Sequence, residues 1–159
     1  MAASPVHGNA LCSAFADHSG MYLHTLVAGL PHADRTALDE ASELRSYQCD
    51  ETVLASGEWT DRLFCVASGL LHVVSHGRGS DGGVVTDSIR PDEFFLGPTL
   101  SESRYQARHA LVAAQASSVY LIPAVAMRGL CEQHPQVALK LLGIAIERTR
   151  AMRMQLGQG

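Results

Sequence analysis

The chain has 159 residues, which is enough for one domain with a proper core and too few for two. Hydrophobic residues make up 47% of it and charged residues 18%, the composition of a globular protein. Its 12 Lys and Arg are outnumbered by 16 Asp and Glu, so the chain alone lacks the basic surface that nucleic-acid binding requires. No apolar run approaches the roughly 20 residues that span a bilayer, and no signal peptide is recognisable, so we expect a cytoplasmic protein.

The N-terminal part of the chain is expected to be an arm followed by helices. Residues 1–20 show no clean period and are interpreted as an arm. From Met21 an apolar stripe at helical spacing predicts a helix that ends at Pro31. A second short helix is predicted from Asp34, as its N-cap, to Leu44.

The middle of the chain has the pattern of a β-roll. Between Leu44 and Pro123, short apolar runs alternate with turn residues and predict strands of an antiparallel barrel or jelly roll. These runs are LRSYQC, TVLA, RLFCVA, GLLHVVSH, GVVTDSI, ARHALVAA and SSVYLIP. The helical period then returns, first in residues 124–134 and then in a long segment from Pro135 to Leu156. We therefore expect a β-roll with flanking helices over residues 21–134 and a separate long helix over residues 135–159.

Several patterns of enzymes and cofactor sites can be weighed against this fold. The stretch GRGSDGG, residues 77–83, contains G-x-G-x-x-G, but a strand-like run follows it, so a hairpin is predicted instead of a dinucleotide loop. His72 and His76 would lie about 13 Å apart on one strand, too far to share a metal unless His109 approaches one of them. The four cysteines include no C-x-x-C and are interpreted as small buried hydrophobes: Cys12, Cys49, Cys65 and Cys131.

The stretch FFLGPTLSESRYQARHA, residues 94–110, has the residue types of an anion-binding loop. Gly97 permits a sharp turn, Pro98 suits the first position of a short helix, and Thr99 supplies a hydroxyl group. Arg108 lies eleven residues after Gly97 and opens a strand-like run, from which its guanidinium can reach an anion. A surface loop that ends in a solvated arginine is the alternative interpretation.

Residues 26–156 as a whole resemble the cyclic-nucleotide-binding-type sensor domain of the Crp/Fnr family of bacterial transcription regulators. The resemblance runs through LVAGLPHADRTALDEASELRSYQCDETVLASGE and through RLFCVASGLLHVV, which is similar to the family's hairpin around Ser68 and Gly69. It continues in RPDEFFLG, SSVYLIP and the helix from Pro135. It implies a double-stranded β-helix with N-terminal helices and a long C-terminal dimerisation helix.

The resemblance also implies an effector site, which this sequence matches in part. Gly97 and Arg108 stand at the spacing of the family's cyclic-phosphate cassette. Pro98 replaces the glutamate that holds the ribose hydroxyl, and His109 replaces a small hydroxyl residue. The loss of a charged acceptor for a buried hydroxyl costs roughly 1.5–3 kcal/mol. We therefore expect a small anionic effector, bound by Gly97, Pro98, Thr99, Arg108 and His109, and weak recognition of cyclic AMP.

Other branches of the same family sense oxygen or haem. An iron–sulfur cluster is not expected, since Cys12 alone lies in the N-terminal region. Haem remains an alternative cofactor, with His72 as the first candidate ligand beside His7, His18 and His24. The family's helix-turn-helix module would follow the long helix, and the sequence ends before it. DNA contact is therefore expected only through a module absent from this chain, which is either an excised sensor or a natural short relative.

The C-terminal helix is predicted to form a homodimer, because residues 137–146 are apolar nearly all round. A coiled-coil seam at 3-4-3-4 spacing is formed by Leu142, Ala145, Thr149, Met152 and Leu156. The nearby Arg148, Arg150 and Arg153 fall outside this seam and are expected to be solvated. The alternative is a helix packed wholly against its own roll.

Together these observations predict a non-enzymatic sensor and dimerisation domain of a Crp/Fnr-type regulator. The alternatives are a haem- or redox-sensing member of that family, a cupin-like metalloenzyme on a similar roll, and a stand-alone binding module.

Overall fold

The computed structural model describes residues 21, 24–77, 82–97, 100 and 102–157, so the predicted N-terminal arm lies outside the described residues. The helical elements are the 3-10 helix η2 (Thr25–Val27), α2 (His32–Ala41), α3 (Ala124–Gln133) and α4 (Pro135–Gly157). The strands are β1 (Glu43–Tyr47), β2 (Thr52–Leu54), β3 (Trp59–Thr60), β4 (Arg62–Ser68), β5 (Leu71–Ser75), β6 (Val84–Ile89), β7 (Phe94–Phe95), β8 (Tyr105–Gln106), β9 (Ala110–Ala113) and β10 (Ser117–Pro123). The predicted order of helices, β-roll and helices is confirmed.

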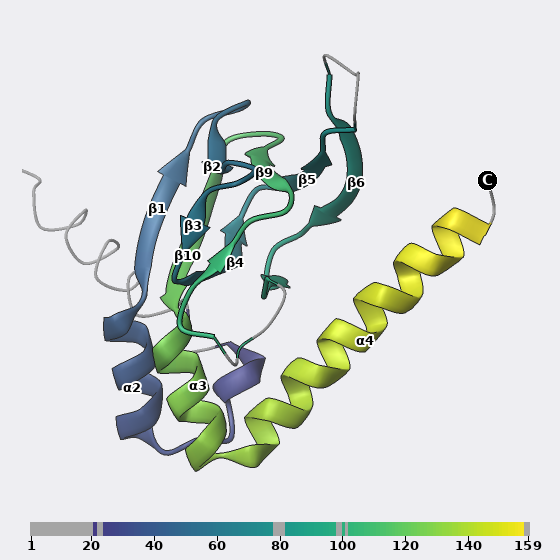
Figure 1. The fold of residues 1–159 in the computed structure, drawn as a ribbon. Helices are drawn as coiled ribbons and strands as arrows, with labels where there is room; N and C mark the ends of the chain where they lie inside the picture. Colours follow the sequence, from purple (N-terminus) through teal and green to yellow (C-terminus); the bar gives the residue numbers. More distant parts are fainter. Residues whose placement is uncertain (1–20, 22–23, 78–81, 98–99, 101, 158–159) are drawn as a thin grey trace, which may run out of the picture.

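Two antiparallel sheets of four strands make up the roll (Figure 1). Sheet A has the order β1-β10-β4-β7, and sheet B has the order β2-β9-β5-β6. A short separate pair joins β3 to β8. Every strand pairs with antiparallel neighbours, as the alternating short runs and tight turns of the sequence predict. The fold is the jelly roll expected from the sequence.

Strand β4 is buried on both faces because it lies between two hydrophobic cores. Its residues Phe64 and Val66 point into the core between the two sheets, where they meet Leu71 and Leu111 among others. Leu63 and Cys65 alternate with them and point to the opposite face, which the helices cover. Strand β10 is buried in the same way, which accounts for the continuous apolar character of RLFCVA and SSVYLIP.

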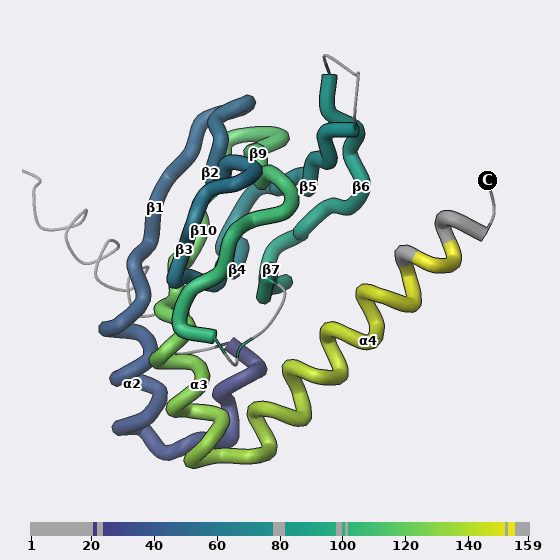
Figure 2. The backbone as a smooth tube through the Cα atoms, viewed as in Figure 1, coloured from purple at the N-terminus to yellow at the C-terminus, as the bar shows by residue number. Residues whose placement is uncertain are grey.

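The helices η2, α2 and α3 and the start of α4 lie together at one end of the roll, and α4 then runs up beside it (Figure 1). η2 runs beside α3 and the first turns of α4, and its Leu26 and Val27 are buried in the core under sheet A (Figure 2). The prediction of a continuous helix that ends at Pro31 is wrong, because its described residues are helical only as 3-10 turns, at Met21 and at Thr25–Val27. Leu26, Val27 and Leu30 of its apolar stripe are buried, but the backbone follows tertiary contacts and not the helical period. Within the described part of the chain, no helix is both long and apolar enough to cross a membrane.

The second predicted helix is shorter than expected and begins earlier. Its N-cap is Pro31, and Asp34 lies inside the first turn. It ends at Ala41 because Glu43 and the residues after it pair with β10. Propensity alone does not show where a helix must stop so that the chain can join a sheet.

The turn at Ser68 and Gly69 is not the hairpin expected from the sequence. β4 pairs with β7 and β10, whereas β5 pairs with β6 and β9, so this turn carries the chain from sheet A to sheet B. Gly69 has a φ of 95°, and a Cβ there would lie 2.2 Å from the hydroxyl of Ser117.

The predicted hairpin between β5 and β6 is confirmed, since Ser75 pairs with Val84 across it. Strands β3, β7 and β8 were not foreseen, because two residues are too few to show a period.

The described cysteines differ in exposure. Cys65 is buried in β4, and burial raises the pKa of its thiol to about 12. Cys131 is half-buried, and Cys49 is exposed, so the expectation that every cysteine is a buried hydrophobe is wrong for Cys49. Cys49 follows β1 at the turn into β2, where its Sγ donates to Ala114 O at 3.3 Å.

We predict that iodoacetamide at about pH 8 modifies Cys49 in the folded protein and leaves Cys65 intact. With a pKa about four units above that pH, Cys65 has a thiolate fraction of about one in ten thousand, and its side chain is also shielded. Peptide mass mapping after timed labelling measures both sites, and denatured protein, in which both react, is the control. Equal rates at the two cysteines in folded protein would contradict the burial of Cys65.

Candidate functional site

Gly97 ends the segment that leads from β7 into the predicted anion-binding loop. Its φ of 70° lies in the left-handed region, and a Cβ there would come within 2.6 Å of the ring of Tyr105. Both observations require glycine at this position. Pro98 and Thr99, which the sequence assigns to the same loop, lie outside the described residues.

Tyr105, whose ring lies against Gly97, is itself held in place by burial and by a hydrogen bond. Its ring is buried, and its hydroxyl donates to Arg62 O at 3.0 Å. Burial raises the pKa of Tyr105, so the hydroxyl stays protonated and keeps this hydrogen bond. The backbone that follows is held by three hydrogen bonds: Gly57 N donates to Ala107 O at 2.8 Å, Ala107 N donates to Glu58 O at 2.8 Å, and Ser56 Oγ donates to Arg108 O at 3.3 Å.

Arg108 and His109 form an exposed bend between β8 and β9, and the strand predicted to include them begins at Ala110. No hydrogen bond or ion pair engages the guanidinium of Arg108 within the described residues. The backbone of Arg108 is therefore anchored while its side chain is exposed. Tyr105 connects the positions of Gly97 and Arg108 in the described chain: its ring lies against Gly97, and Arg108 follows it by three residues in the sequence.

The histidines considered as haem ligands are placed differently. His72 pairs with Ser88 and Val112, and because Leu71 and Val73 point into the roll, its side chain is on the outer face of sheet B. His24 is buried, and both of its ring nitrogens have partners: Nε2 donates to Asp92 O at 2.8 Å, and Nδ1 accepts from Leu26 N–H at 3.0 Å. His7 and His18 lie outside the described residues.

A metal site is not formed by the residues that the structure describes. Among them, no group of three or more His, Cys, Asp or Glu is arranged to hold an ion. His72, His76 and His109 are therefore not brought together as metal ligands within the described chain.

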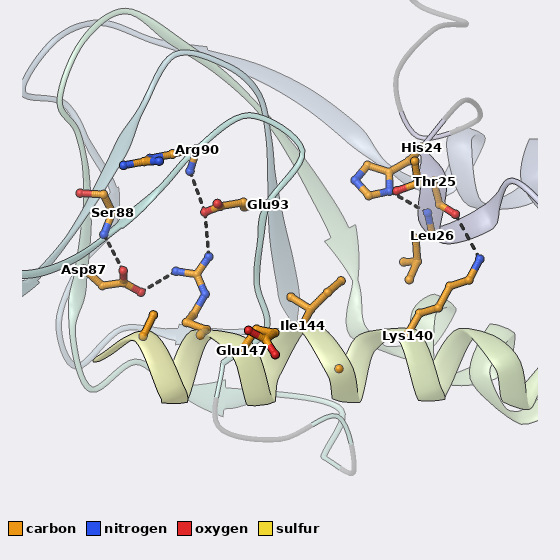
Figure 3. A pocket seen from close by; sticks show the side chains of 13 residues that line it. His24, Thr25, Leu26, Asp87, Ser88, Arg90, Glu93, Lys140, Ile144 and Glu147 are labelled. Atoms are coloured by element: carbon orange, nitrogen blue, oxygen red, sulfur yellow. Dashed lines mark hydrogen bonds and ion pairs between the residues drawn. The ribbon is translucent and has the colours of Figure 1, made fainter. Parts of the chain in front are cut away.

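A cleft of about 930 Å³ lies between α4, η2 and the segment from β6 to β7. Its walls carry His24 and Thr25 on one side and Asp87 and Glu93 on the other (Figure 3). Near the α3 end of α4, Lys140 Nζ donates to Thr25 O at 3.2 Å. The cleft thus separates the long helix from the roll while polar contacts bridge it at two places along α4.

The second bridge is formed by Arg148, whose guanidinium lies between two carboxylates (Figure 3). Its Nη1 donates to Asp87 Oδ2 at 2.5 Å, and its Nη2 donates to Glu93 Oε2 at 3.1 Å. The side chains of Arg148 and Asp87 are each 22% exposed, so the expectation that Arg148 is solvated is wrong. The Nε of Arg148 is buried without a partner in the described chain, and an unpaired buried donor costs about 1–3 kcal/mol.

The helix phase explains why Arg148 differs from the arginines near it. Val137, Leu141, Ile144 and Arg148 follow a 4-3-4 spacing and form the inward stripe of α4, in which Val137 and Leu141 are buried. Arg150 is 68% exposed and pairs only with Glu147 in the described structure. The C-terminal arginines were expected to be solvated as a group, although the 4-3-4 spacing in the sequence places Arg148 in the inward stripe. No sequence pattern marks Asp87 or Glu93 as its partners.

The turn Arg90–Glu93 connects the bridge to the rest of the roll. Glu93 N donates to Arg90 O at 3.0 Å, and Asp92 has a left-handed φ of 69°. Val66 in β4 donates to Glu93 O at 3.2 Å, and His24 donates to Asp92 O, so β4 and the cap of η2 hold the same turn. Since β7 follows the turn directly, Glu93 lies four residues before Gly97.

Comparisons with known proteins agree with this architecture. Residues 44–134 match the family model of the cyclic nucleotide-binding domain. A search of curated protein sequences found no match.

Several solved structures share the fold. A cyclic nucleotide-binding domain from Methylobacillus flagellatus KT has a TM-score of 0.72 at 15% identity, covering 91% of this chain and 86% of that chain. The sensor domain of the transcriptional regulator DNR from Pseudomonas aeruginosa has a TM-score of 0.71 at 15% identity, with coverages of 89% and 93%. The catabolite activator protein of Thermus thermophilus has a TM-score of 0.66 at 20% identity over 84% of this chain, which spans 62% of that protein. At these identities the likeness establishes the fold alone.

We predict that Gly97→Ala destabilises the protein by roughly 1–3 kcal/mol, because the new methyl group meets Tyr105 in a backbone conformation that alanine avoids. Gly129→Ala is the matched control, since it lies inside α3 with open space around it and should be neutral or stabilising by up to about 1 kcal/mol. Urea unfolding measures both changes. Equal stability of the two variants would show that Gly97 is not under this constraint.

Proposed function

The chain belongs to the cyclic nucleotide-binding domain family, and we propose that it is the effector-sensing and dimerisation part of a Crp/Fnr-type transcription regulator. In this proposal the chain binds its effector without converting it and transmits the bound state through α4. Two separate features support the binding step: the backbone requires glycine at position 97, and Arg108 has an exposed side chain on an anchored backbone. The regulator fold of the solved structures supports the assignment to a sensor.

The chemistry of the cassette points to a small anionic effector. Arg108 supplies a planar, permanently charged fork that suits a phosphate or carboxylate. Pro98 offers no side-chain acceptor for a ribose hydroxyl, and His109 stands where the family has a small hydroxyl residue. The effector in this proposal is therefore held chiefly through its anionic group.

The outward face of α4 supports the dimerisation step. Leu139 is 70% exposed, Leu142 57% and Ile146 47%, although Val137 and Leu141 on the inward face are buried. A helix that is apolar on both faces needs a second partner to cover the outer one. A second copy of α4 fits this role, and two residues of the proposed seam, Leu142 and Thr149, are exposed. The full proposed seam consists of Leu142, Ala145, Thr149, Met152 and Leu156. DNA contact would belong to a helix-turn-helix module of the parent regulator.

We predict that cyclic AMP binds weakly or not at all, about ten- to a hundred-fold below a site that keeps the ribose carboxylate. Calorimetric titration at neutral pH measures this affinity. Arg108→Ala should remove any residual binding, and Arg104→Ala should not, because Arg104 is stacked 4.7 Å from the centre of the Trp59 ring. A micromolar or tighter dissociation constant, or binding that ignores Arg108→Ala, would overturn the proposed cassette.

We predict that the chain sediments at micromolar concentration with twice the monomer mass and that Leu142→Glu produces a monomer. A charge on the outer face of α4 cannot be desolvated in a dimer seam. Gln136→Glu is the matched control, because it adds the same charge at an exposed position of α4 away from the apolar face. Circular dichroism should show the roll folded in both variants, and a wild-type chain that stays monomeric would contradict the dimer.

A further inference from the structure

The two halves of α4 are held to the body of the protein by different means. The first half has buried apolar contacts through Val137 and Leu141, together with the bond from Lys140 to Thr25 O. Beyond Ile144, the hydrogen bonds and ion pairs between the described part of α4 and the roll come from Arg148. Figure 1 shows the far part of α4 running alongside the roll, set apart from its strands in this view. Within one copy of the chain, Arg148 therefore supplies the polar contacts that fix the direction of this half relative to the roll.

The near end of α4 has the geometry of a hinge. α3 ends at Gln133 and α4 begins at Pro135, so His134 alone separates them, with non-helical angles of φ −130° and ψ 86°. Pro135 has no N–H, so it donates no backbone bond across the junction. Arg148 lies 13 residues from Pro135, a lever of about 20 Å, so a swing of about 15° moves it by about 5 Å.

We propose that Arg148 is a latch that selects one of two orientations of α4, and that loss of its pairs with Asp87 and Glu93 lets the helix swing about His134. Two observations indicate that the latch is easily released. The Nε of Arg148 is buried without a partner, so the closed state leaves one donor unsatisfied. Glu93 is 43% exposed, so solvent and salt screen its pair with Arg148.

The position of the latch connects it to the cassette. Arg148 holds the turn Arg90–Glu93, and this turn continues through β7 into Gly97. A shift of β7 therefore changes the place of Glu93 and strains or relaxes the latch. This coupling step rests on the proposed function, whereas the latch itself does not, because its contacts lie entirely between residues of this chain.

The test measures the orientation of α4 in ligand-free protein by pulsed dipolar spectroscopy. Spin labels at Ser46→Cys and Arg153→Cys, both at exposed positions, report the distance between β1 and the far half of α4. The background carries Cys12→Ser, Cys49→Ser and Cys131→Ser, while Cys65 is buried and keeps its thiol. Dilution with unlabelled protein removes distances between copies.

With Arg148 intact we expect one narrow distance distribution. Arg148→Gln should broaden it or add a second population displaced by about 5 Å or more. Arg150→Gln is the matched control, because it removes the same charge from the same helix at a side chain that is 68% exposed, and it should leave the distribution unchanged. An unchanged distribution in Arg148→Gln, or an equal change in Arg150→Gln, overturns the proposal.

Two further measurements keep the test decisive if Arg148→Gln does not fold. Asp87→Asn removes one partner of the latch and should shift the distribution in the same direction. About 1 M NaCl, at which the Debye length is about 3 Å, should populate the second orientation in protein with Arg148 intact. The absence of both shifts overturns the latch. A failed effector titration leaves these ligand-free measurements unaffected, so it bears on the proposed function alone.

Discussion

The burial of β4 and β10 on both faces is the constraint on which the rest of the structure depends. Phe64 and Val66 of β4 close the core between the sheets, while Leu63 and Cys65 receive the helices. Because these two strands pair with each other at the middle of sheet A, neither core can form without the other. The helices are therefore part of the same cooperative unit as the roll, and η2, α2 and α3 have a fixed place from which α4 departs.

The turn Arg90–Glu93 connects the buried strands and helices to both regions proposed to be functional, the segment at Gly97 and the helix α4. It is bonded to β4 through Val66, to the cap of η2 through His24, and to α4 through Arg148. The chain then passes through β7 to Gly97, where a left-handed backbone packs directly against Tyr105. The candidate cassette and the long helix thus share one structural neighbour, although the cassette is at one end of β7 and the helix contact at the other.

The helix α4 carries apolar residues on both its inward and its outward face. Its inward face is apolar near α3 and charged farther along, whereas its outward face exposes Leu139, Leu142 and Ile146. The inward face explains why the helix stays near its own roll, and the outward face explains why the roll alone does not satisfy it. The alternative of a helix packed on its own roll therefore describes the inward face, and the proposed second copy would cover the outward face.

Patterns that depend on neighbouring residues could be predicted from the sequence. The strands longer than two residues, the β5–β6 hairpin, α3 and α4 follow from apolar periodicity and from turn residues, which are local properties of the chain. The resemblance in motif order pointed to the jelly roll, and Gly97 stood out as a turn residue. The sequence alone also showed that α4 carries more apolar surface than a single face can bury.

Contacts between distant segments were decided only by the tertiary structure. The sequence period predicted a helix from Met21, but burial of Leu26 and Val27 beneath sheet A and the bond from His24 to Asp92 O produced a 3-10 turn. The partners of Arg148 are 61 and 55 residues away, and no local pattern marks Asp87 or Glu93 as their counterparts. Apolar periodicity assigns a residue to a face of its element. What that face meets depends on how the elements pack, and so the solvated arginine expected from the sequence became the link between α4 and the roll.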